Sequence, residues 1–137
     1  MSKEFIWPIN VYYEDTDAGN VVYHANYLKF FERARSEWLK YLEIDQAALL
    51  AEDIAFAVAK SDVDYLYPAR FNDELEVVSE IKDVRGASLT FVQKLFHKGE
   101  RQKILCQATI NVVCLKLKAF KPCRMPAAIR EEFQRVS

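Results

Sequence analysis

The chain has 137 residues, about half of them apolar, and carries 19 Lys and Arg against 20 Asp and Glu. This length suits a single domain over residues 1–137 with one hydrophobic core, and the composition is that of a globular protein. The balanced charge lacks the basic face that nucleic-acid binding needs, so no such partner is expected. No secretory signal and no apolar run of roughly 20 residues occurs, and we expect a cytoplasmic protein without a transmembrane segment.

The three cysteines do not predict a disulfide or a metal site. Cys106 and Cys114 lie in one predicted strand, eight positions and therefore ~26 Å apart, too far to pair. With His24 and His97 the cysteines form no zinc-ligand spacing, and no metal is expected. We interpret them as small buried hydrophobes in a reducing cytosol.

One long amphipathic helix is predicted from about residue 22 to residue 43. A strand is predicted over 5–13, near a sheet edge because Pro8 has no N–H to donate to a neighbouring strand. A polar loop at 14–20 lies between this strand and the helix. Within the helix, apolar residues recur every three or four positions and form a broad face. These residues are Tyr27, Phe30, Phe31, Ala34, Trp38, Tyr41 and Leu42.

The rest of the chain is predicted to be mostly strands. Alternating apolar residues and turn signals indicate strands at 56–67, about 75–81, 89–96 and 104–114, and a short helix is a candidate for 126–135. Ser79 interrupts the apolar row of the second of these strands. Sequential strands joined by tight turns form an antiparallel sheet, which must curl around the apolar helix. The predicted fold class is α+β.

The loop at 14–20, EDTDAGN, carries three carboxylates directly before the helix. A calcium loop is rejected because residue 19 is Gly and no Glu falls at the twelfth position. The pattern alone favours a turn that caps the helix. A general base or nucleophile beside the helix N-terminus, whose free N–H groups polarise a carbonyl, is the other interpretation.

Neither histidine has a role that composition alone can establish. His24 is placed about one turn into the helix, and His97 falls in a predicted hairpin turn. The sequence contains no serine nucleophile elbow, Gly-rich phosphate loop or Rossmann fingerprint.

The longer segment that contains this loop, at 11–35, favours the general base or nucleophile over the capping turn. Its sequence is VYYEDTDAGNVVYHANYLKFFERAR. It closely resembles the signature of the hotdog-fold acyl-CoA thioesterases of the 4-hydroxybenzoyl-CoA thioesterase superfamily, nearest the YbgC-type group associated with the Tol–Pal system. The resemblance continues through 55–77, 85–91 and 112–122. Two departures are Asn20, where Gly is more common, and LKLKAFK at 115–121, where an acidic residue is more common.

The resemblance implies a hotdog fold, an antiparallel five-stranded sheet wrapped around one long helix. It also implies a homo-oligomer, a dimer or tetramer, with active sites between subunits. Asp17 matches the family's catalytic Asp, and Tyr13 and His24 match its conserved Tyr and His. A backbone N–H at or beside His24 would polarise the thioester carbonyl. The implied substrate is a coenzyme A thioester, with acyl carrier protein as a second candidate partner and no cofactor.

The chemistry of thioesters agrees with this implication. The thiolate is a good leaving group, so one ionised carboxylate can act either as general base or as nucleophile, and the sequence leaves both open. The phosphates of coenzyme A require cations, for which Lys60, Arg70 and Arg85 are candidates, with Ser88 as a hydrogen-bond donor. Each of these four is equally compatible with a solvated residue in a strand or turn.

Two other functions would have different sequence requirements. A non-catalytic hotdog domain that binds acyl-CoA or acyl carrier protein would not need Asp17, Tyr13 and His24 together. A hotdog dehydratase would need a His and acidic pair on a different motif, which the sequence does not contain.

Overall fold

Six strands and three α-helices follow one another along residues 3–137, the part of the chain that the computed structural model describes. In chain order they are β1 (Phe5–Asn10), a 3-10 turn η1 (Tyr13–Asp15), α1 (Asn26–Tyr41), α2 (Gln46–Ala51), β2 (Ile54–Tyr65), β3 (Glu74–Lys82), β4 (Ser88–His97), β5 (Cys106–Lys116), β6 (Lys121–Pro122) and α3 (Ala127–Val136). Within this range no helix is long and apolar enough to span a membrane.

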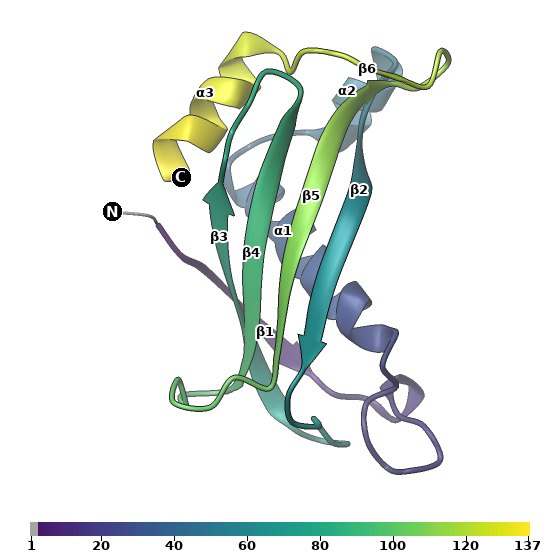
Figure 1. The fold of residues 1–137 in the computed structure, drawn as a ribbon, viewed down its shortest axis with the longest axis vertical. Coiled ribbons are helices and arrows are strands. Elements are labelled where there is room, and N and C mark those ends of the chain that lie inside the picture. Colours follow the sequence, from purple (N-terminus) through teal and green to yellow (C-terminus); the bar gives the residue numbers. More distant parts are fainter. Residues whose placement is uncertain (1–2) are drawn as a thin grey trace.

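The strands form one antiparallel sheet in the order β1-β3-β4-β5-β2, with the two-residue β6 paired to β5 (Figure 1). The edge position of β1 confirms the prediction made from Pro8. The strands after the helix were predicted to follow one another through tight turns, but β2 lies beside β5 at the opposite edge and is not paired with β3. The connection 66–73 therefore crosses the end of the sheet.

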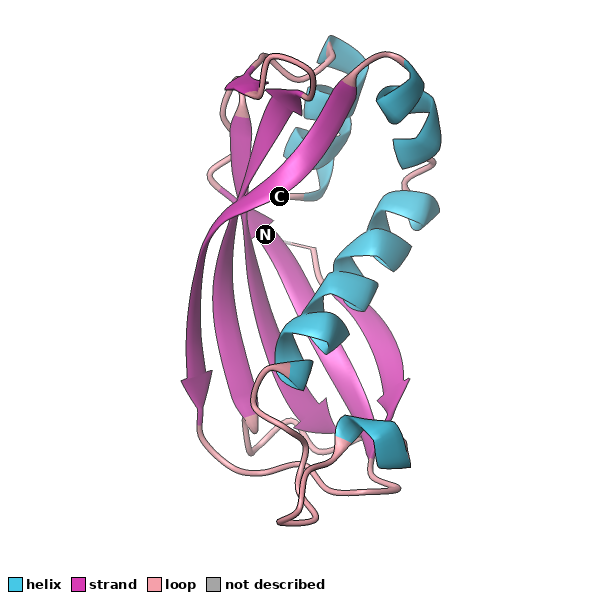
Figure 2. Cartoon of the chain, turned by 90° about the vertical axis from the view of Figure 1, so that its right-hand side faces the viewer, coloured by secondary structure: helices cyan, strands magenta, loops and turns pink. Residues whose placement is uncertain are grey.

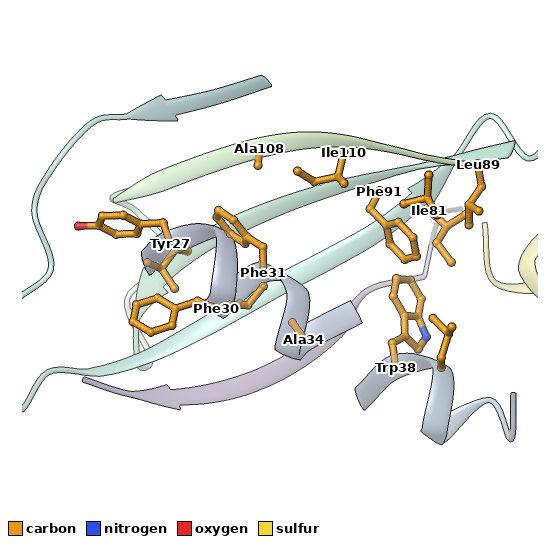
Figure 3. Packing of buried hydrophobic residues seen from close by; sticks show 14 of the residues in the cluster. Tyr27, Phe30, Phe31, Ala34, Trp38, Ile81, Leu89, Phe91, Ala108 and Ile110 are labelled. Carbon is orange, nitrogen blue, oxygen red and sulfur yellow. The ribbon is translucent and has the colours of Figure 1, made fainter. Parts of the chain in front are cut away.

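The core lies between α1 and the curved sheet, as Figure 2 shows. Helix α1 buries Tyr27, Phe30, Phe31, Ala34 and Trp38, whose side chains point toward residues of β3, β4 and β5 (Figure 3). Burying each large apolar side chain stabilises the fold by about 1.5–3 kcal/mol. The predicted apolar face of the helix is thus the face that holds it on the sheet, except for Tyr41, which lies at the end of α1 and is 74% exposed.

The helix content and strand count differ from the prediction. The description of one long helix is not confirmed, because α1 has 16 residues and α2 and α3 are additional helices. Helix α1 begins at Asn26 rather than near Val22, since Val22 is held in a bridge with Thr16 and its N–H donates to the Ala69 carbonyl. The short β6 makes the sheet six-stranded instead of five-stranded. The α+β class is as predicted.

Ser79 does not interrupt the buried face of β3. It is fully buried, and its hydroxyl accepts a hydrogen bond of 3.0 Å from Gln93 Nε2. The same amide donates to the Phe31 carbonyl of α1 at 2.9 Å, and Arg35 Nη1 donates to Gln93 Oε1 at 3.0 Å. Burial lowers the pKa of the Arg35 guanidinium, and nearby Glu32 opposes this shift. A polar cluster centred on Gln93 therefore connects α1 to the middle of the sheet.

Candidate active site

The loop 12–25, between β1 and α1, is held by backbone hydrogen bonds to itself and to the segment 66–73. The Asp17 N–H donates to the Val21 carbonyl at 2.9 Å, and the Tyr23 N–H donates to the Asp15 carbonyl at 2.9 Å. A bridge between Val21 and Arg70 attaches the loop to the end of the sheet. The loop therefore presents its side chains from a defined backbone.

Asp15 has a structural role. Its side chain is buried, with only 3% of the residue exposed. One carboxylate oxygen accepts from the Tyr12 N–H at 2.9 Å, and the other accepts from Asn26 Nδ2 at 2.6 Å. Both oxygens are thus occupied, and they connect η1 to the first residue of α1.

Asp17 differs from Asp15 in exposure and in its partners. Its side chain is exposed, and Oδ1 accepts the Gly19 N–H at 2.8 Å, whereas Oδ2 has no partner within residues 3–137. A Cβ at residue 19 would lie 3.2 Å from Asp17 Oδ1, so glycine keeps this space open. Asn20 has a φ of +61°, the left-handed conformation that asparagine tolerates. Asp17 makes the turn that the loop pattern predicted, but it does not cap α1.

The start of α1 lies just beyond this turn and is uncapped. Ala25 is the N-cap residue and provides no side-chain hydrogen bond. Within the described range the backbone N–H groups of His24 and Ala25 have no hydrogen-bond acceptor. His24 was predicted one turn inside the helix, but it precedes Asn26 and lies in the turn before it. Free N–H groups at a helix N-terminus carry partial positive charge and suit a polarised carbonyl oxygen.

The His24 ring lines an open hollow of ≈ 260 Å³ beside this helix terminus. The ring centroid is 4.6 Å from that of Tyr23 and 6.3 Å from that of Tyr65. At the back of the hollow, the Tyr27 hydroxyl accepts the Ala69 N–H at 3.1 Å, and burial raises the pKa of this phenol. The remaining lining residues are Val22, Leu66, Tyr67 and Pro68.

Sequence reasoning missed the tyrosines that form this hollow. Tyr65 and Tyr67 end β2 and begin the following connection, about 40 positions after His24 in the chain. The aromatic pair in DYLYP was the available signal, but only the folded chain places it beside His24. Lys103 also lies here, with Nζ 4.1 Å from the centroid of the Tyr67 ring.

Tyr13 lies in η1 and does not line the hollow. It is 80% exposed, and its ring packs edge-on against Phe71 with centroids 5.9 Å apart. Its carbonyl accepts hydrogen bonds from the backbone N–H and the hydroxyl of Thr16. Its side chain is therefore available to solvent on the loop that carries Asp17.

The candidate phosphate-binding residues are not gathered within one chain. Arg70 is exposed and bridged to Val21 at the loop, whereas Lys60 is exposed in the middle of β2, opposite Asn111. Arg85 and Ser88 lie at the turn between β3 and β4, where the Arg85 N–H donates to the Ser88 carbonyl at 2.8 Å. The ten residues of β4, about 30 Å in length, separate this turn from the end of the sheet near the loop.

A second cavity, of ≈ 130 Å³, lies under the C-terminal half of α1. Arg35, Glu32 and mainly apolar residues line it, and none of the predicted site residues is among them. No group of three or more His, Cys, Asp or Glu residues within 3–137 could hold a metal ion.

Comparison with known proteins identifies the family. The sequence model described as "Thioesterase-like superfamily" matches residues 11–133. "Acyl-CoA thioester hydrolase YbgC" of Escherichia coli O6:H1 is 47% identical over 130 residues, covering 95% of this chain and 96% of that protein. "Acyl-CoA thioesterase YbgC" of Haemophilus influenzae is 43% identical over 134 residues, covering 97% and 96%.

The solved structures agree in fold. The DHNA-CoA thioesterase from Staphylococcus aureus has a TM-score of 0.89 to this chain at 24% identity, covering 97% of this chain and 90% of that one. Similarity to thioesterases of this kind confirms the hotdog fold predicted from the sequence. With its family match over nearly the whole length, the chain belongs to the Thioesterase-like superfamily.

Proposed function

We propose that this chain hydrolyses acyl-CoA thioesters to a carboxylic acid and coenzyme A. The observation that carries the proposal is the exposed Asp17 carboxylate, whose Oδ2 has no partner among residues 3–137, on the loop that leads into the uncapped start of α1. The YbgC relatives, which match this chain over nearly its whole length, are named for the same activity.

In the proposed reaction, the thioester carbonyl oxygen accepts hydrogen bonds from the free N–H groups of His24 and Ala25. These donors stabilise the negative charge that develops on this oxygen, and each such donor contributes up to ~10²–10³ in rate. The Asp17 carboxylate activates a water molecule or attacks the carbonyl carbon directly. The C–S bond then breaks, and the coenzyme A thiolate leaves without needing a strong acid. With water as the nucleophile the carboxylic acid forms directly, whereas direct attack leaves an acyl–Asp17 anhydride that a water molecule hydrolyses to the acid and free Asp17.

The His24 ring and the tyrosines of the hollow are proposed to position the thioester rather than to transfer protons. The imidazole lies among aromatic rings, and no carboxylate within residues 3–137 bonds to it. Tyr13, exposed on the Asp17 loop, is proposed to contact the bound substrate.

A homo-oligomer is proposed because β2 is a long and exposed edge strand. It has 12 residues, most of its middle is exposed, and Val58 is 51% exposed. An edge strand of this length can pair with a second strand, and its charged residues Lys60, Asp62 and Asp64 would then need partners of opposite charge across the pair. If the β2 strands of two chains paired antiparallel about a two-fold axis, one end of the first sheet would lie beside the opposite end of the second sheet. Arg85 and Ser88 of one chain would then approach the Asp17 loop of the other. Lys60 and Arg70 complete the proposed cationic set for the coenzyme A phosphates.

Thiol release from a panel of short, long and aromatic acyl-CoAs tests the proposed activity, with Asp17→Asn as the inactive reference. We expect wild-type protein to release thiol from at least one substrate class. Binding of acyl-CoA without any thiol release would favour the alternative, a non-catalytic domain that binds acyl-CoA or acyl carrier protein.

The oligomer is tested by light scattering at micromolar concentration. We expect a dimer or tetramer for the wild-type protein and for Val58→Thr, and a shift toward monomer with reduced activity for Val58→Lys, which places a charge on the edge strand. A fully active wild-type monomer would contradict the proposal. Acyl carrier protein as a second partner, a cytoplasmic location, the Tol–Pal association and a single domain over 1–137 stay predictions from the sequence.

A further inference from the structure

Cys114 and Cys123 face each other across the β5–β6 pair, at the end of the sheet opposite the Asp17 loop (Figure 1). Their Sγ atoms are 3.6 Å apart, and the Cys123 N–H donates to the Cys114 carbonyl at 2.9 Å. The ladder pairs Leu115 with Pro122 and Lys116 with Lys121, so the two cysteines are the next opposed residues in the same register.

This arrangement meets the geometric requirement of a disulfide. The Cys123 N–H bond to the Cys114 carbonyl holds the two backbones side by side, and the two side chains lie on one face with their sulfurs in contact. The sulfurs need to approach from 3.6 Å to about 2.05 Å, which side-chain rotation supplies without a change of register.

The two thiols differ in exposure. Cys114 is completely buried, whereas Cys123 is partly exposed. Burial and the neighbouring Cys123 raise the pKa of the Cys114 thiol to about 12, so Cys114 remains protonated at neutral pH. A soluble oxidant therefore meets Cys123 first. Cys106 is buried and lies eight positions along β5 from Cys114, roughly 26 Å away, so it cannot substitute for either partner.

We propose that Cys114 and Cys123 are an oxidative modification site, which a hydroperoxide converts to an intramolecular disulfide. The Cys123 thiolate attacks one peroxide oxygen and the O–O bond breaks, which makes Cys123 a sulfenic acid; the hydroxide or alkoxide that leaves takes a proton from solvent and becomes water or an alcohol. The Cys114 sulfur then attacks the Cys123 sulfur, loses its proton and releases the hydroxyl as water. The two thiols lose two electrons and the peroxide gains two.

The disulfide closes residues 114–123 and secures the segment that leads into α3. After Cys123 the Met125 N–H donates to the Gly86 carbonyl at 2.8 Å, and Phe133 of α3 packs against Phe56 of β2 with centroids 6.0 Å apart. Closing a loop of this size stabilises a protein against unfolding, and an increase in Tm of roughly 5 °C or more is expected.

The experiment treats the reduced full-length protein with hydrogen peroxide and then alkylates the remaining thiols under denaturing conditions. Before alkylation, wild-type protein and the Cys106→Ser control are expected to lose about 2 Da relative to their reduced forms. After alkylation and digestion, tryptic peptides 104–116 and 119–124 should be joined in a bond that dithiothreitol cleaves. Cys114→Ser and Cys123→Ser should show neither the bond nor the increase in Tm. The Cys106→Ser control assigns the bond to Cys114, because it removes the other cysteine of peptide 104–116.

Three alkylatable thiols in peroxide-treated wild-type protein would overturn the proposal. Addition of two or three oxygens to Cys123 without a crosslink would also overturn it, as would a crosslink that joins two chains. None of these readouts depends on thioesterase activity, so a failure of this proposal can be distinguished from a failure of the proposed function.

Discussion

The cluster around Gln93 and the loop 12–25 are both polar, but they use their polar groups differently. In the cluster, Gln93 donates to Phe31 and Ser79 and accepts from Arg35, so its amide is fully used by the protein. In the loop, Asp17 Oδ2 and two backbone N–H groups have no protein partner within residues 3–137. Buried polar groups must be paired, whereas exposed groups on a fixed backbone remain available to a ligand. The difference separates residues that hold the fold from residues that are available for chemistry.

The same contrast occurs within the loop itself, between two carboxylates two positions apart. Asp15 is buried and both its oxygens accept hydrogen bonds, from Tyr12 and Asn26. Asp17 is exposed and only one of its oxygens accepts. Replacement of Asp by Asn should therefore lower mainly the stability of the protein at residue 15 and mainly its activity at residue 17.

The largest expected effect is that of Asp17→Asn on activity. The amide can still accept the Gly19 N–H, so the turn survives, but it cannot act as a base or nucleophile. We expect turnover of acyl-CoA to fall by ~10² or more, on the usual scale of general-base catalysis, with little change in Tm. Activity within a few-fold of wild type would contradict the role of Asp17.

Gln93→Leu should have the largest effect on stability. The substitution leaves the buried Ser79 hydroxyl and the partly buried Arg35 guanidinium without their shared partner. We expect the free energy of unfolding in urea to fall by about 2 kcal/mol, the cost of buried polar groups that lose their hydrogen bonds. Ser79→Ala, which leaves Gln93 bonded to Phe31 and Arg35, should cost less. Equal losses for the two variants would argue against Gln93 as the centre of the cluster.

Asp15→Asn is the matched counterpart of Asp17→Asn. The new amide cannot accept at both atoms, so either the Tyr12 N–H or the Asn26 side chain loses its acceptor. We expect a loss of stability of about 1–2 kcal/mol by urea unfolding. Turnover by the folded fraction should fall less than in Asp17→Asn. A larger loss of turnover than in Asp17→Asn, at unchanged stability, would assign the catalytic role to Asp15 and the structural role to Asp17.

The smallest effect is expected from His24→Ala. The backbone N–H proposed to bind the carbonyl oxygen survives this substitution, and only a contact from the ring is lost, so kcat/KM should fall about tenfold or less. Steady-state kinetics across the pH range would check this, because loss of one limb of the pH–rate profile would show that the imidazole transfers a proton. Wild-type rates with an unchanged profile would leave His24 without a role in the reaction.

The sequence by itself determined the features that depend on neighbours along the chain. Alternating apolar residues located β3, β4 and β5, and the three-to-four spacing defined most of the buried face of α1. The resemblance over 11–35 also identified the family and drew attention to Asp17, Tyr13 and His24. The strand and helix predictions succeeded because periodicity is a property of short segments. The roles of Asp17, Tyr13 and His24 stay predictions.

Only the tertiary structure decided which of these residues meet. Contacts with Ala69 and Arg70, more than 40 positions away, hold residues 21–22 extended and so place His24 before α1 rather than inside it. Distant segments likewise bring Tyr65 to His24 and Gln93 to Ser79. Burial then separates Asp15 from Asp17, although both are aspartates of one polar loop. The physical reason is that burial and hydrogen-bond partners depend on packing between distant segments, which no local pattern specifies.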